Sequence, residues 1–159
     1  MLKPAFLYKN EIENHFAEVM YSDECFYFMG YAHGHACPNL EPADNVYDWA
    51  IINKANEVIG WFAYQINPIT DSVYNFGLYS FDKGNVLIGK DVFEKIEELI
   101  ANHRRIEWRV IAGNPVIRSY DRLCKKHNGQ KVVFHKVTKD NNGIYHDEYV
   151  YEILSENEG

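Results

Sequence analysis

Apolar-rich stretches separated by polar turns mark the middle of the chain as β-structure. Residues 48–53, 58–66 and 73–81 are extended and rich in apolar side chains, and the polar stretches NKANE and NPITDS separate them. Such segments between clusters of turn residues are typical of strands joined in hairpins. The pattern therefore predicts three consecutive antiparallel strands, which end before Lys83 and Gly84.

The hydrophobic period changes from two to 3.6 residues in the next segment, residues 85–102. Its apolar side chains fall on one stripe, formed by Val92, Phe93, Ile96, Leu99 and Ile100. Charged residues occupy the opposite side, as in an amphipathic helix that packs on a sheet. We therefore predict a long helix directly after the third strand.

The C-terminal third contains both patterns. Residues 106–111 predict a strand, residues 114–127 a helix, and residues 132–138 and 145–154 two strands joined by the turn KDNNG. A strand, a helix and a further strand in succession imply a parallel strand pair. The sequence thus predicts an α+β fold with a twisted, mostly antiparallel sheet, one parallel pair and flanking helices.

The N-terminal segment is less regular. Helical spacing of apolar residues predicts a helix over residues 11–20, with Asn10 as its N-cap. An aromatic-rich stretch, residues 25–45, follows and is interrupted by Pro38 and Pro42. We expect a short helix or strand there, and then a loop.

Composition agrees with one domain. The chain has 159 residues, of which 47% are hydrophobic, and this is enough to bury a sizeable core. No repeat or linker divides it. We therefore expect a single domain over residues 1–159, with only residues 155–159 as a loose tail.

Charge and cysteine usage restrict the environment and the partners. No apolar run is long enough to span a membrane, and the N-terminus lacks the apolar core of a signal peptide. The three cysteines are few and widely spaced, which favours the reduced cytoplasm. A net charge of −7 argues against a basic nucleic-acid-binding face. We expect no nucleic-acid or membrane partner.

The junction between the third strand and the long helix, FDKGNVLIGKDVFEKI, is a candidate anion site. Unpaired N–H groups and the dipole at a helix start favour phosphate. Gly84 and Gly89 would allow close approach of the backbone, and Lys90 would add a positive charge. A plain strand-to-helix turn, with Asn85 as cap, is the simpler structural alternative.

The second candidate is the helix in GNPVIRSYDRLCKKHNG. Asn114 is a suitable cap, Pro115 suits the first helical position, and Asn128-Gly129 suits the helix end. Tyr120 falls on the apolar face of this helix. On these grounds alone, Tyr120 is a core tyrosine whose hydroxyl reaches a polar partner.

The third candidate is HGHACP, in which His33, His35 and Cys37 alternate. No second cluster completes the four ligands of a structural zinc site, so we expect no metal there. The segment could instead line a substrate pocket. The sequence also lacks a GxSxG motif and an obviously reactive cysteine, which gives a nucleophilic hydrolase little support.

Together these segments resemble the GNAT superfamily of acyl-CoA-dependent N-acetyltransferases, from about residue 49 to residue 154. NEVIGWFAYQI looks like the second hairpin of that family, and FDKGNVLIGKDVFEKI stands where the family keeps its pyrophosphate loop. GNPVIRSYDRLCKKHNG is similar to its Asn-Pro helix, and the last two strands also correspond. The resemblance implies a GNAT-like domain in which the parallel strands splay apart and residues 47–154 bind the cofactor. Residues 1–46 would then shape the acceptor side.

The resemblance also implies roles for individual residues. Acetyl-CoA would lie between the splayed strands as co-substrate. Tyr120 would be catalytic, because its hydroxyl would protonate the departing thiolate. The cofactor would contact Tyr79, Phe81, Gly84, Asn85, Leu87, Gly89, Lys90 and Asn114. The family loop usually reads Gln/Arg-x-x-Gly-x-Gly/Ala, and here Gly84 and Leu87 replace its first two defined positions.

The implied activity is direct transfer of acetyl from acetyl-CoA to a primary amine of a small molecule or peptide. The general base stays open between Glu107, Asp48 and a water chain. The degenerate phosphate loop leaves one alternative, a non-catalytic GNAT-like module that binds a small molecule or a partner protein. A homodimer is compatible with the sequence.

Overall fold

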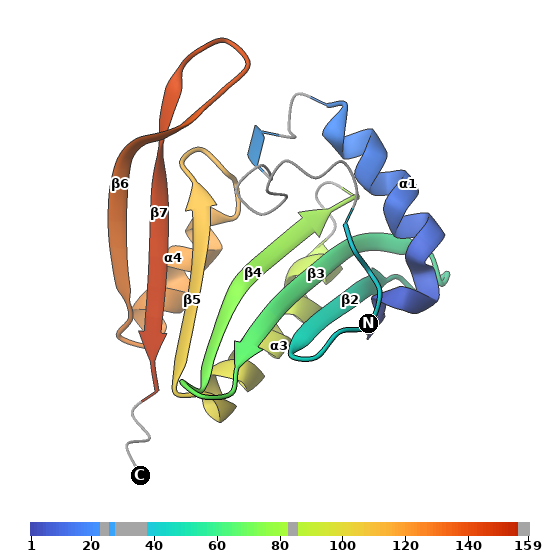
Figure 1. The fold of residues 1–159 in the computed structure, drawn as a ribbon, viewed down its shortest axis with the longest axis horizontal. Helices are drawn as coiled ribbons and strands as arrows, with labels where there is room; N and C mark the ends of the chain where they lie inside the picture. Colours follow the sequence, from blue (N-terminus) through green and yellow to red (C-terminus); the bar gives the residue numbers. More distant parts are fainter. Residues whose placement is uncertain (23–25, 28–37, 83–85, 156–159) are drawn as a thin grey trace.

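The computed structural model describes residues 1–22, 26–27, 38–82 and 86–155, which form a seven-stranded sheet (Figure 1). The strand order is β1-β2-β3-β4-β5-β7-β6, and only the β4–β5 pair is parallel. The strands are β1 (Leu2–Pro4), β2 (Val46–Ile52), β3 (Val58–Asn67), β4 (Ser72–Ser80), β5 (Arg105–Ile111), β6 (Gln130–Lys139) and β7 (Tyr145–Leu154). The helices are a 3₁₀ turn (Ala5–Tyr8), α1 (Lys9–Met20), α3 (Val86–Asn102) and α4 (Ile117–Lys126).

The predicted order of elements is confirmed, including the parallel pair. Strand β1 was not predicted, because three residues are too few to show a hydrophobic period. The predicted starts of the first helix and of the Asn-Pro helix are wrong in detail. Helix α1 begins at Lys9 with no side-chain cap, so Asn10 lies inside it, and α4 begins at Ile117, three residues after Asn114. None of the described helices is long and apolar enough to cross a membrane.

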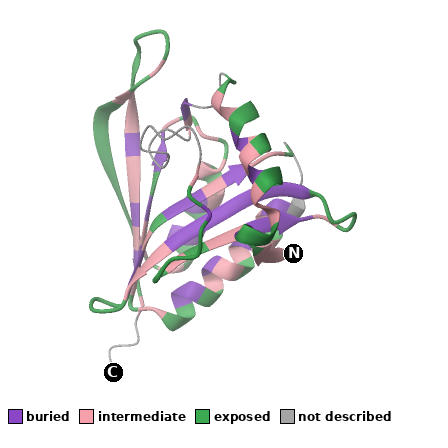
Figure 2. Ribbon diagram, turned by 45° about the vertical axis from the view of Figure 1, so that its right-hand side comes forward, coloured by how far each residue is buried: buried purple, intermediate pink, exposed green. Residues whose placement is uncertain are grey.

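Helices cover both faces of the sheet (Figures 1 and 2). On one face, α3 and α4 pack on a core that includes Val92, Leu123 and Phe62. On the other face, Phe16 of α1 packs in a second core with Tyr79. Successive strand residues point to opposite faces, so single strands contribute to both cores.

The pairing of β4 with β5 stops partway along both strands. Val73 pairs with Ile106 and Phe76 with Trp108, so β4 has one residue more than β5 between these two rungs. Asn75 has a positive φ of 49°, and the β3–β4 register shifts at the same place. These are the features of a β-bulge, which bends the strand that carries it.

Beyond the Phe76–Trp108 rung, β4 and β5 diverge (Figure 1). We call the region between residues 77–80 of β4 and residues 109–111 of β5 the split. The splayed parallel pair that the family resemblance implied is therefore present, and its closed end lies at the bulge.

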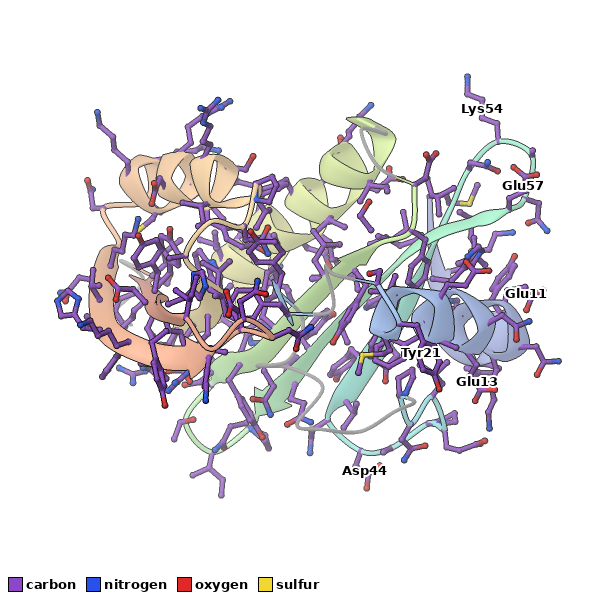
Figure 3. All side chains as sticks on the ribbon, turned by 90° about the horizontal axis from the view of Figure 1, so that it is seen from above. Glu11, Glu13, Tyr21, Asp44, Lys54 and Glu57 are labelled. Atoms are coloured by element: carbon purple, nitrogen blue, oxygen red, sulfur yellow. The ribbon has the colours of Figure 1, made fainter. Side chains whose placement is uncertain are left out.

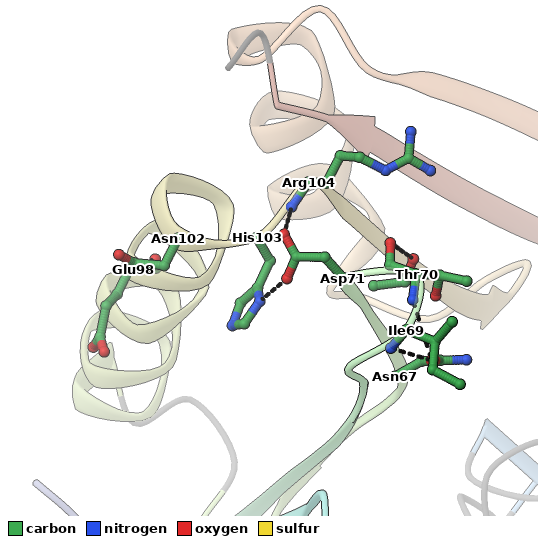
Figure 4. A network of polar contacts seen from close by, with 9 residues as sticks. Asn67, Ile69, Thr70, Asp71, Glu98, Asn102, His103 and Arg104 are labelled. Carbon is green, nitrogen blue, oxygen red and sulfur yellow. Dashed lines mark hydrogen bonds and ion pairs between the residues drawn. The ribbon is translucent and has the colours of Figure 1, made fainter. Parts of the chain in front are cut away.

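The strand starts below the closed end are held together by the β3–β4 turn (Figure 4). Oδ1 of Asp71 lies 2.8 Å from Nδ1 of His103, and Oδ2 accepts the N–H of Arg104 at 2.9 Å. The N–H of Arg105 donates to the Asp71 carbonyl at 3.3 Å. Asp71 therefore ties the start of β4 to the start of β5.

We predict that Asp71→Asn lowers stability in a pH-dependent way. The hydrogen bond with His103, and then that from the Arg104 N–H, lower the pKa of Asp71. The folded state thus binds this proton more weakly than the unfolded state, and Asp71 stabilises the fold above its ordinary pKa near 4. This contribution is lost as the pH falls below that value.

Chemical unfolding of wild type and Asp71→Asn at pH 7 and pH 3 measures this effect. The variant should be less stable at pH 7, and the difference should shrink at pH 3. Asp44→Asn, at an exposed position before β2, is the matched control and should change little at either pH. An unchanged gap between wild type and Asp71→Asn would argue against the assigned role.

Candidate functional site

The β4 edge of the split consists of backbone groups. The N–H of Phe81 donates to the carbonyl of Ile59 on β3 at 2.9 Å, so the backbone of Phe81 faces β3. Because the direction of these groups alternates along a strand, those of Leu78 and Ser80 face the split. Tyr79 and Phe81 stay predicted cofactor contacts. Leu78 and Ser80, which the sequence did not single out, present their peptide groups to the split.

The side chains of Tyr79 and Phe81 belong to the layer under α1. The ring of Tyr79 is buried, 4.9 Å from that of Trp61 and 5.3 Å from that of Phe16. The ring of Phe81 stacks on His15 of α1 at 5.0 Å. These contacts anchor α1 to the end of β4 and so position the strand that borders the split.

Tyr120 lies against the closed end of the split. Its ring centroid is 5.5 Å from that of Trp108 and 6.2 Å from that of Phe76, the two residues of the last β4–β5 rung. Phe93 of α3 and Tyr151 of β7 complete its surroundings, at 6.1 and 5.9 Å. Two residues of the rung and two of the flanking elements thus enclose the tyrosine ring.

The hydroxyl of Tyr120 has no hydrogen bond to any other described residue. The polar partner expected of a core tyrosine is therefore not found in the described part of the chain. Burial raises the pKa of this hydroxyl well above its ordinary value, so it stays protonated at neutral pH. The hydroxyl can therefore donate a hydrogen bond, although its raised pKa makes it a weaker acid than an ordinary tyrosine.

The turn before α4 aims Tyr120 toward the sheet. Oδ1 of Asn114 accepts the N–H of Val116 at 3.1 Å, and the Asn114 N–H donates to the Ile111 carbonyl at 3.2 Å. Asn114 therefore closes the turn that leaves β5, rather than capping the helix as predicted. Pro115 lies in this turn, two residues before the helix begins.

The predicted helix end at Asn128-Gly129 is confirmed. Asn128 has a φ of 52°, and the Gly129 N–H donates to the Cys124 carbonyl at 2.8 Å, as in a Schellman motif. A Cβ on Gly129 would lie 2.6 Å from the Glu152 carbonyl oxygen. Only glycine therefore lets α4 return this closely to β7.

The start of α3 is described in part. Gly84 and Asn85 lie outside the described residues, and only the backbone of Leu87 is described. Gly89 lies in the first turns of the helix, and a Cβ there would meet no atom of another described residue within 4 Å beyond the neighbouring helix backbone. Lys90 is exposed, with its Nζ 3.9 Å from Glu94. The helix start thus offers open space beside a solvent-exposed lysine.

The α1-side face carries a carboxylate with an unusual environment. Oδ1 of Asp48 accepts the indole N–H of Trp61 at 3.1 Å, and burial raises the pKa of Asp48 to about 6. Asp48 pairs with Ala63, which in turn pairs with Gly77 at the start of the split. Cross-strand partners share a face, so Asp48 lies two strand spacings, roughly 10 Å, from Gly77 of β4, and Ala63 lies between them.

Glu107, the other candidate base, is already neutralised. Oε2 of Glu107 lies 2.6 Å from a guanidinium nitrogen of Arg105, which also binds Glu152 at 2.6 Å. Glu107 is therefore already engaged by a cationic side chain. Between these two residues, the structure favours Asp48.

No metal site is found in the described part of the chain, where no three His, Cys, Asp or Glu residues group together. His33, His35 and Cys37 lie outside the described residues. Cys124 is buried, and burial raises the pKa of its thiol. It is therefore not an activated nucleophile.

Comparison with solved structures identifies the fold as that of the GCN5-related N-acetyltransferases. The chain is similar to an N-acetyltransferase from Staphylococcus aureus Mu50, with a TM-score of 0.66, 14% identity and 98% of each chain covered. A GCN5-related N-acetyltransferase from Brucella melitensis gives a TM-score of 0.62 and 16% identity over 97% of this chain and 75% of that one.

A third similar structure is a ribosomal L7/L12 α-N-protein acetyltransferase in complex with coenzyme A. It gives a TM-score of 0.53 and 16% identity, over 69% of this chain and 62% of that one. No protein-family model matches the sequence, and no curated protein matches it. The similarity therefore lies in the fold.

We predict that Gly89→Ala separates stability from cofactor binding. Alanine is more favourable than glycine inside a helix by about 0.5–1 kcal/mol, and the added methyl group would clash with none of the described residues. If the phosphates of coenzyme A use the open space at Gly89, the same methyl group obstructs them. Unfolding should therefore show a gain in stability, and calorimetry a loss of affinity for coenzyme A.

Gly129→Ala is the contrasting control for the stability measurement. Its Cβ would clash with the Glu152 carbonyl, so we expect a loss of about 1–3 kcal/mol. Affinity of Gly89→Ala for coenzyme A equal to that of wild type would exclude the start of α3 as the phosphate site.

Proposed function

We propose that this chain, which has the fold of the GCN5-related N-acetyltransferases, transfers acetyl from acetyl-CoA to a primary amine. The observation that carries the proposal is the split between β4 and β5, with the hydroxyl of Tyr120 buried at its closed end. A pantetheine arm would pair with the peptide groups of Leu78 and Ser80. The thioester would then lie beside Tyr120, and the phosphates at the start of α3.

The transfer needs one acid and one base. The amine nitrogen attacks the thioester carbonyl, the carbon–sulfur bond breaks, and Tyr120 gives its proton to the departing thiolate. The amine loses a proton, which restores the tyrosine hydroxyl through solvent. The products are an amide and free coenzyme A, and the enzyme forms no covalent intermediate. The aromatic side chains around Tyr120 would keep water away from the thioester.

Asp48 fits the role of base through a short water chain. It lies on the α1-side face, its pKa of about 6 leaves it mostly ionised at pH 7, and Ala63 and Gly77 leave little side-chain volume on the way to the split. A carboxylate with a pKa close to neutral is a more effective base than an ordinary aspartate.

The acceptor would approach from the same face. Figure 3 shows Glu11, Glu13 and Asp44 pointing outward from α1 and from the segment before β2. With the net charge of −7, these side chains favour a cationic acceptor, such as a small-molecule or peptide amine.

We predict that Tyr120→Phe binds acetyl-CoA as wild type does but releases the thiol roughly 10²–10⁴-fold more slowly. The substitution keeps the ring and removes a hydroxyl that bonds no described residue, so the fold should be retained. Calorimetry measures binding, and thiol release is followed with a panel of primary amines. Tyr145→Phe, at an exposed tyrosine of β7, is the matched control and should keep full activity.

The two measurements separate the possible outcomes. Equal rates for Tyr120→Phe and wild type would remove Tyr120 from the mechanism. Absence of acetyl-CoA binding by wild type would contradict the enzyme, and would favour the alternative of a GNAT-like binding module.

We predict that Asp48→Asn removes the acid limb of the pH–rate profile. In wild type the rate should rise with pH through about 6, as Asp48 ionises. The variant should also be more stable than wild type at pH 7. The folded pKa exceeds the ordinary value of 3.8, so ionisation costs stability as the pH rises from about 4 to 6.

Rates of thiol release and unfolding midpoints, each measured from pH 5 to pH 8, test both effects. A wild-type acid limb that persists unchanged in Asp48→Asn would assign the proton transfer to another group. Glu107→Gln is the comparison at the second carboxylate, and it should leave the acid limb in place.

A further inference from the structure

Strand β6 is an exposed edge with an apolar centre. It is the last strand of the described sheet, and Figure 2 shows it exposed along most of its length. Val132, Val133 and Phe134 are 49%, 41% and 47% exposed. A long apolar edge strand is a template for pairing with another strand.

The orientation of the β6 backbone follows from its neighbours. The Ala112 N–H donates to the Asp147 carbonyl at 2.9 Å, so the backbone of Asp147 faces β5. By alternation, Glu148, Val150 and Glu152 face β6, where their partners are Phe134, Val132 and Gln130. The remaining residues of this segment direct their N–H and C=O groups outward: Lys131, Val133 and His135.

The regular part of this edge ends at a bulge. The register between β6 and β7 shifts between Phe134 and Thr138, and Lys136 has a φ of 55°. The straight segment available for pairing is therefore residues 130–135. This segment is short, so only a few registers with a second such strand would place apolar side chains opposite apolar side chains.

We propose that β6 is the interface with a second copy of this chain, through antiparallel pairing of residues 130–135 about a two-fold axis at Val133. In this register Val133 faces Val133 of the partner subunit, and Val132 faces Phe134 of the partner subunit. The outward N–H and C=O groups of Lys131 and Val133 meet those of the partner's His135 and the partner's Val133. The two sheets become continuous.

Self-complementarity of the segment favours a second copy over another strand. In this register Lys131 lies opposite the partner's His135, and no lysine lies opposite a lysine. The charge of Lys131 is already compensated by Asp121 at 2.7 Å, and His135 lies 3.1 Å from Asp147. The segment is thus self-complementary in backbone direction and apolar contacts, and its charges are compensated within each chain. The inference does not depend on the proposed activity.

Light scattering of the purified full chain at about 100 µM tests the proposal. Wild type should have twice the monomer mass of 18.6 kDa. Val133→Lys places two like charges directly opposite each other at the axis, and should weaken the dimer roughly tenfold or more. Ile144→Lys makes the same change at an exposed residue outside the register, and should remain dimeric.

Circular dichroism tests whether each variant is folded. If Val133→Lys does not fold, Phe134→Lys serves as the second interface variant. A monomeric wild type would overturn the proposal. This holds also if β6 then proves to bind an extended peptide in place of a second copy. A dimer dissociation constant of Val133→Lys equal to that of wild type, measured by dilution from about 100 µM, would overturn the register, as would a monomeric Ile144→Lys.

Discussion

The extra residue in β4 is the constraint on which the rest of the structure depends. With Asn75 in a left-handed conformation, β4 can pair with β5 only as far as Phe76 and Trp108. Asp71 holds the strand starts together below the bulge, so the strands can separate only above it. The bulge therefore creates a wedge-shaped gap between β4 and β5, which is closed at the bulge and open at the other end.

The remaining parts of the candidate site lie along this split. Chain reversal at Asn114 and the tight return at Gly129 place α4 so that Tyr120 lies against the last rung. The same opening exposes peptide groups of β4 that a regular sheet would pair. One group, the partly buried carboxylate of Asp48, is kept at a cost to stability. Such costs are typical of functional sites.

The sequence predicts strands β2 to β7 and helices α1, α3 and α4 because each has a strong local period, and the parallel pair follows from their order. The bulge has no such signal, since its effect depends on the register of β4 with two neighbours. The start of α4 was misplaced because Asn-Pro suits a turn as well as a cap. The environment of Asp48 and the direction of the Leu78 and Ser80 peptide groups likewise follow from strand pairing, which local patterns do not specify.

The most direct test of the split as the cofactor site is amide hydrogen exchange with and without acetyl-CoA. The N–H groups of Leu78 and Ser80 should become protected when the ligand binds, because they would pair with it. The N–H of Phe81 already donates to Ile59 and should change little. Unchanged exchange at Leu78 and Ser80 under saturating acetyl-CoA would contradict the account.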